Sequence, residues 1–62
     1  MTTGQVQQLE SLITWLKQNI EDFLDQGLDA SSIASRFLSI GDQPKQLSHD
    51  TVTKVISKMY FS

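Results

Sequence analysis

Residues 6–23 read VQQLESLITWLKQNIEDF, and their apolar members recur at steps of three and four residues. This spacing is typical of one face of an α-helix. The seam consists of Val6, Leu9, Ile13, Leu16, Ile20 and Phe23. β-Branched residues alternate with Leu or Phe along the seam, and this alternation favours two-stranded coiled coils. The sequence therefore predicts a long amphipathic helix that serves as the oligomer interface.

The chain as a whole predicts an all-α fold, with residues 1–62 forming a small three-helix domain that associates through its long N-terminal helix. This first helix is expected over about residues 3–26. Thr2 and Gln5 have the spacing of a capping box, in which each residue satisfies a backbone N–H of the other. Gly27 suits the left-handed conformation that often ends a helix.

Two shorter helices are predicted after this one. The second covers about residues 30–39 behind an Asp29 cap, and the third covers about 49–60 behind a Ser48 cap. A polar loop is expected between them, because Pro44 cannot continue a helix. The apolar residues expected to be buried are Ile33, Ala34, Phe37 and Leu38 on the second helix, and Val52, Val55, Ile56, Met59 and Tyr60 on the third.

The small size of the chain points to association with another chain. It has 62 residues, no cysteine and one histidine. A disulfide and a thiolate metal site are therefore excluded, and one histidine cannot make a multi-histidine site. Domains of this size usually need a disulfide, a metal or a partner subunit. We therefore expect a homodimer or a higher oligomer, with no metal and no cofactor.

The composition argues against a membrane protein and against an enzyme. No apolar run approaches the roughly 20 residues that a transmembrane helix needs. The first residues lack the layout of a secretion signal, so a cytoplasmic location is expected. There is no cysteine nucleophile and no glycine-rich phosphate loop, and a three-helix chain lacks the volume for a water-excluding pocket. No small-molecule substrate is therefore expected.

Charge is distributed unevenly along the chain, whose net charge is -2. Residues 1–29 carry five acidic side chains against one lysine, which gives -4. Residues 30–62 carry four basic side chains against two acidic ones, which gives +2. Ordinary surface variation is the simple explanation, and two binding surfaces of opposite charge are the alternative.

The C-terminal half carries a family resemblance. Ile33-Ala34-Ser35-Arg36-Phe37-Leu38 followed by Leu47-Ser48-His49-Asp50-Thr51-Val52 resembles the two-helix unit of helix-turn-helix DNA-binding proteins. Residues 40–47 make a longer connection than that family's short turn. The resemblance implies a dimeric regulatory protein whose third helix enters the major groove of duplex DNA. The DNA-binding residues implied are Lys54, Lys58, Thr53, Ser57, His49, Arg36 and Lys45. The alternative is that the third helix merely closes a small core.

A second candidate surface lies on the first helix. Glu21, Asp22 and Asp25 cluster near its C-terminal end, where their charge opposes the helix dipole. A protein-interaction module or small inhibitor could use this patch, together with Trp15, against a basic protein partner without DNA contact. A solvated outer face and a Trp15 anchored in the core are the structural alternatives. A third possibility is a domain that only oligomerises.

Overall fold

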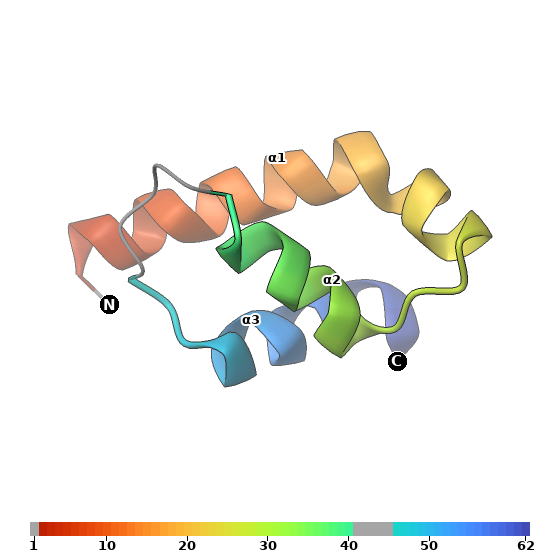
Figure 1. Ribbon diagram of the computed structural model, residues 1–62. Helices are drawn as coiled ribbons and strands as arrows, with labels where there is room; N and C mark the ends of the chain where they lie inside the picture. Colours follow the sequence, from red (N-terminus) through yellow and green to blue (C-terminus); the bar gives the residue numbers. More distant parts are fainter. Residues whose placement is uncertain (1, 41–45) are drawn as a thin grey trace.

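The computed structural model describes residues 2–40 and 46–62, and the regular structure in this part of the chain is helical (Figure 1). Its elements are α1 (Thr3–Asp25), α2 (Ala30–Leu38), α3 (His49–Ile56) and the π-helical turn η1 (Ser57–Phe61). The helix α1 runs along the whole molecule, whose longest dimension is 33 Å, while α2 and α3 pack closely on each other beside it. The predicted all-α fold with a long first helix is confirmed.

Local side-chain chemistry sets both ends of α1. At the start, the Thr2 hydroxyl accepts the N–H of Gln5 at 3.3 Å, and the Gln5 side-chain oxygen accepts the N–H of Thr2 at 3.0 Å. At the other end Gly27 has a φ of 73°. The N–H of Leu28 then donates to the Phe23 carbonyl at 3.1 Å, and that of Gly27 donates to the Leu24 carbonyl at 3.0 Å. These two bonds form a Schellman motif, which satisfies carbonyls that the helix end would otherwise leave unpaired.

The two short helices have the caps that their sequences predict. Asp29 Oδ1 accepts the N–H of Ser32 at 2.8 Å, and this bond holds the pKa of the Asp29 carboxyl below its usual value. The Ser48 hydroxyl accepts the N–H of Thr51 at 3.2 Å at the start of α3. The residues around Pro44, predicted as a loop, lie outside the described part of the chain.

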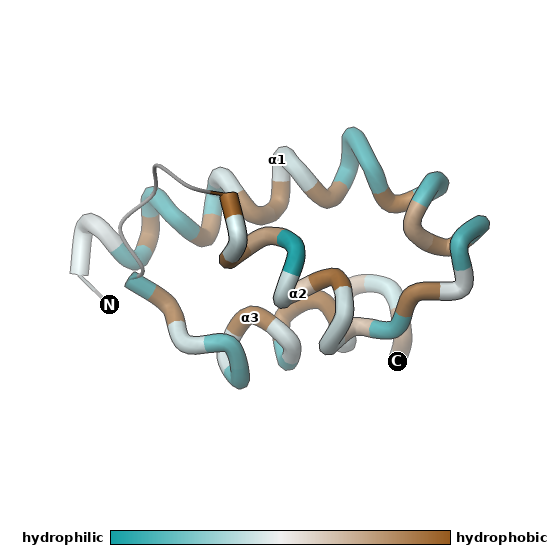
Figure 2. The backbone as a smooth tube through the Cα atoms, viewed as in Figure 1, coloured by the Kyte–Doolittle hydropathy of each residue, from teal (hydrophilic) through white to brown (hydrophobic). Residues whose placement is uncertain are grey.

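The apolar faces of the three helices meet in one core. The apolar side of α1 faces α2 and α3, and its opposite side is mostly hydrophilic (Figure 2). The buried apolar residues are Leu12, Leu16, Phe23, Ala30, Ile33, Ala34, Phe37, Leu47, Val52 and Ile56. Their burial supplies the main stabilisation of the fold, because each large apolar side chain removed from water contributes about 1.5–3 kcal/mol.

The C-terminal end departs from the predicted helix. After Ile56 the chain continues as the wider π-turn η1 instead of a regular α-helix. A π-turn changes the angular spacing of successive side chains. Tyr60 packs against the core, whereas Met59, predicted to be buried, is 39% exposed. The expectation for Met59 was therefore wrong, because it assumed that α-helical spacing continues beyond Ile56.

One polar side chain is buried among these apolar ones. Gln8 of α1 is 6% exposed, and its side-chain oxygen accepts the N–H groups of both Gln46 and Leu47 at 2.8 Å. The bonds join α1 to the segment that enters α3, across 38 and 39 residues of sequence. Gln8 thereby positions the start of α3 relative to α1.

Candidate functional site

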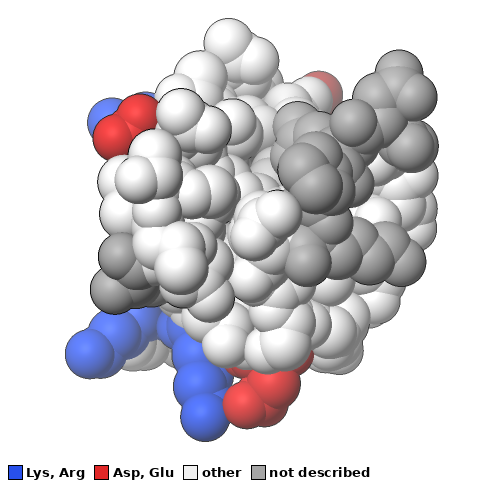
Figure 3. Space-filling model, turned by 90° about the vertical axis from the view of Figure 1, so that its left-hand side faces the viewer, with Lys and Arg blue, Asp and Glu red and all other residues white. Residues whose placement is uncertain are grey.

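The outer face of α3 carries exposed charged side chains. Lys54 of α3 and Lys58 of the adjoining turn η1 are both exposed. Lys54 Nζ lies 3.1 Å from Asp50 Oδ2 one turn earlier on α3. Figure 3 shows the end of the molecule where α1 begins; basic side chains gather at its lower edge, on the side of α3, beside acidic ones. Both side chains of the ion pair are largely exposed to water, so the pair contributes little stability and Lys54 can pair with another group instead.

One of the predicted DNA-binding residues, His49, takes part in the packing of α3 on α2, and a second, Thr53, bonds to it within α3. His49 Nε2 lies 3.2 Å from the Ser31 carbonyl oxygen and 3.0 Å from the Ser35 hydroxyl. The Thr53 hydroxyl donates to the His49 carbonyl at 2.8 Å. The two His49 contacts join the first turn of α3 to α2, whereas the Thr53 bond lies within α3. His49 itself remains exposed.

The remaining predicted DNA-binding residues are spread over both short helices. Arg36 of α2 is exposed, and its guanidinium carbon lies 6.0 Å from the centre of the Phe23 ring. Ser57 follows the last residue of α3 and is half-buried. Lys45 lies outside the described residues. The exposed cations available here for a phosphate backbone are thus Arg36, Lys54 and Lys58.

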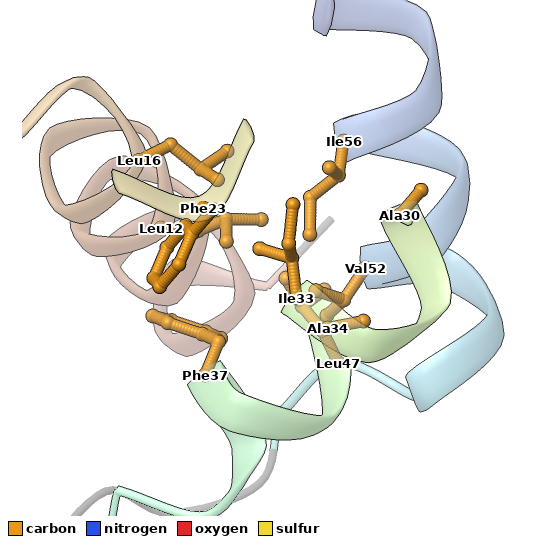
Figure 4. Close-up of a cluster of buried hydrophobic side chains, with 10 residues drawn as sticks. All are labelled: Leu12, Leu16, Phe23, Ala30, Ile33, Ala34, Phe37, Leu47, Val52 and Ile56. Carbon is orange, nitrogen blue, oxygen red and sulfur yellow. The ribbon is translucent and has the colours of Figure 1, made fainter. Parts of the chain in front are cut away.

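The predicted seam of α1 is divided between two sides of the helix. Leu16 and Phe23 point into the chain's own core (Figure 4), where they are 0% and 7% exposed. They face α2 and α3 and are not available to a second chain. Leu12, which the seam omits, is fully buried beside them. The spacing of Gln8, Leu12 and Leu16 at four-residue steps is the signal that could have identified this inward face.

The other seam residues lie beside the core or outside it. Leu9 and Ile20 are half-buried and pack on the edge of the core, and Ile13 is half-buried. Val6 is 39% exposed, and Leu24 near the end of the helix is 48% exposed. An apolar strip of α1 therefore remains outside the single-chain core.

The acidic patch of α1 is exposed as a group. Glu21, Asp22 and Asp25 all face solvent, and within the described residues none of them has a cation within ion-pair distance. Trp15 is not part of that surface, since its ring lies 5.1 Å from that of Phe23 and 5.3 Å from that of Phe37, centre to centre. Trp15 is an aromatic anchor between α1 and α2, which is the alternative foreseen for it.

Two further kinds of site are absent from the described residues. No three His, Cys, Asp or Glu side chains there come together in a way that could hold a metal ion. None of the helices described is both long and apolar enough to cross a membrane. Comparison of the chain with protein-family models, with curated proteins and with solved structures finds no significant match.

Proposed function

We propose that this chain is a small regulatory protein that binds duplex DNA, as a homodimer, through α2 and α3. The observation that carries the proposal is the way α3 is held: His49 bonds it to α2, while Lys54 on α3 and Lys58 on the following turn η1 remain exposed. A helix-turn-helix unit needs such a rigid second helix with a polar outer face, so that this helix can enter the major groove.

The proposed contacts are mainly electrostatic. On binding, Lys54 leaves Asp50 and pairs with a DNA phosphate. Breaking the Lys54–Asp50 pair costs little free energy, because an exposed pair at this spacing contributes only about 0.3–0.5 kcal/mol. Asp50 opposes the phosphate backbone, and the chain has a net charge of -2. One chain therefore binds DNA weakly. A dimer that presents both α3 helices to the duplex has a higher affinity, because the second contact becomes intramolecular.

Replacing both Lys54 and Lys58 with alanine is expected to weaken binding to a duplex of mixed sequence by about tenfold or more at low salt. It should also reduce the slope of log affinity against log salt by about 2 for each bound chain, because two phosphate contacts are lost. Fluorescence anisotropy with labelled DNA measures both quantities. Asp50→Asn is the matched control and should strengthen binding, since it removes the repulsive charge. A wild-type chain that does not bind DNA at low salt contradicts the proposal.

A second function is favoured by a different observation. Leu24 is 48% exposed, and its neighbours in sequence and on the adjoining turn include the exposed carboxylates Glu21 and Asp25. An exposed apolar side chain among unpaired acidic groups is complementary to a basic, amphipathic protein segment. The chain would then act as a protein-interaction module or inhibitor, with no contribution from the lysines of α3.

Neutralising the acidic patch separates this second function from the first. The triple variant Glu21→Gln, Asp22→Asn and Asp25→Asn is expected to weaken binding of a lysine- and leucine-rich helical peptide by about tenfold, measured by anisotropy at low salt. The same variant should bind DNA at least as well as the wild-type chain, because it has lost three negative charges. Equal peptide affinity in variant and wild type contradicts the second function.

A further inference from the structure

We propose that two copies of this chain pair antiparallel along the outer flank of α1, with Glu10 of each copy facing Lys17 of the other. The inference rests on the dimerisation included in the proposed function, and it adds the contact surface and the orientation. The outer flank is the strip formed by Val6, Glu10, Ile13, Lys17, Ile20 and Leu24.

The outer flank lies on one side of α1. Its members follow one another at alternating steps of four and three residues, which is the spacing of a helix that packs lengthwise on another helix. Leu16 and Phe23 turn towards α2 and α3, so the flank lies beside the face that the single-chain core covers. Its Ile13 and Ile20 are half-buried, with Ile20 at the edge of the core. Val6 and Leu24 are its most exposed apolar members, and Ile13 lies at its middle.

The two charges on the flank identify a second copy as the occupant. Glu10 and Lys17 are both exposed, and neither makes an ion pair within the described part of the chain. They lie seven residues apart, about 10 Å along the helix, which is too far for them to pair with each other. A surface with one acidic and one basic group flanking a central isoleucine is complementary to itself when it is turned end to end.

The same charges decide the orientation. A two-fold axis across α1 close to Ile13 places Glu10 opposite Lys17 of the second copy and Lys17 opposite its Glu10. Val6 of one copy then lies near Ile20 of the other, so that apolar side chains meet on both sides of the axis. A parallel, in-register pair would place each charge opposite its own kind, which is unfavourable. Antiparallel pairing is the arrangement in which the apolar and the charged positions both match.

The test is the mass of the chain in solution over a dilution series, measured by sedimentation equilibrium without DNA. Ile13→Asp should give single chains at every concentration, because it places an unpaired charge at the middle of the interface. Glu10→Lys and Lys17→Glu should each raise the dimer dissociation constant by about fivefold or more, since each creates like-charge contacts across the axis. The double variant, which exchanges the two charges, should return to the wild-type constant.

The results separate three claims: the antiparallel orientation, the dimer itself and DNA binding. In a parallel pair the two single charge reversals would leave the constant nearly unchanged, and that result overturns the antiparallel register. A wild-type chain that remains single at the highest concentration overturns the dimer itself. Lys54→Ala with Lys58→Ala is the control and should dimerise as the wild type does, so a failure of DNA binding is seen separately. Far-UV circular dichroism establishes that each variant is folded.

Discussion

Replacing Leu16 with alanine is expected to lower the free energy of unfolding by about 2–5 kcal/mol, which is the range for deleting a fully buried leucine side chain. Leu16 is 0% exposed and lies in the core shared with α2 and α3. A domain of 62 residues has a total stability of only about 3–9 kcal/mol. The urea midpoint should therefore fall markedly, and at the lower end of this stability range helical circular dichroism should be lost even without denaturant.

Val6→Ala is the matched control, because Val6 belongs to the same predicted seam but is 39% exposed. Its effect on single-chain stability should stay below about 1 kcal/mol. The two variants should also differ in their dependence on protein concentration. Loss of a core side chain lowers stability at every concentration, whereas loss of an interface side chain matters only where the dimer forms. Equal effects of the two substitutions would show that Leu16 is not a core residue.

This contrast explains which parts of α1 the sequence could predict. Its ends depend on neighbouring residues: Thr2 with Gln5 at the start, and Gly27 with Leu28 at the end. Such local chemistry is visible in the sequence and was predicted. The choice of which face of α1 is buried does not depend on neighbouring residues alone. The coiled-coil repeat of 3.5 residues and the straight-helix repeat of 3.6 residues per turn diverge by only about 20° per heptad. Over a helix as short as α1, the apolar pattern is therefore compatible with either repeat. The packing of α2 and α3 selects the face that contains Leu12 and Leu16.

In the candidate DNA-binding face, too, some features depend on local sequence and others on contacts between helices. Lys58 is exposed on the turn η1 that follows α3, and the exposure of Lys54 follows from helical spacing on α3. The role of His49 does not, because its bonds reach Ser31 and Ser35 on α2, 18 and 14 residues away in the sequence. Sequence spacing within α3 gives no sign of such a contact. The fold thus gives His49 a structural contact with α2, while its assignment to DNA binding stays a prediction.

Gln8→Ala is expected to lower the free energy of unfolding by about 1–3 kcal/mol, which is the cost of one unsatisfied buried donor. It removes the acceptor of the buried Leu47 N–H, and also that of the part-buried Gln46 N–H, whose loss costs less. The two N–H groups belong to Gln46 and Leu47, and Leu47 itself is buried. Gln7→Ala is the control, because Gln7 is the exposed neighbour. Urea unfolding measures the loss, and hydrogen exchange at the Leu47 N–H reports the bond directly.

The consequence of the Gln8 substitution for binding follows from the position of Leu47. Leu47 immediately precedes Ser48, the N-cap of α3. Releasing it from α1 frees the start of α3, which carries Lys54 and leads into η1 with Lys58, so DNA affinity should fall even under conditions in which the variant remains folded. Gln8→Glu keeps an acceptor at the same position and should retain most of the protection of the Leu47 N–H. If the Leu47 N–H exchanges at the wild-type rate in Gln8→Ala, then Gln8 does not hold α3 in place, and the lysines of α3 owe their position to α2 alone.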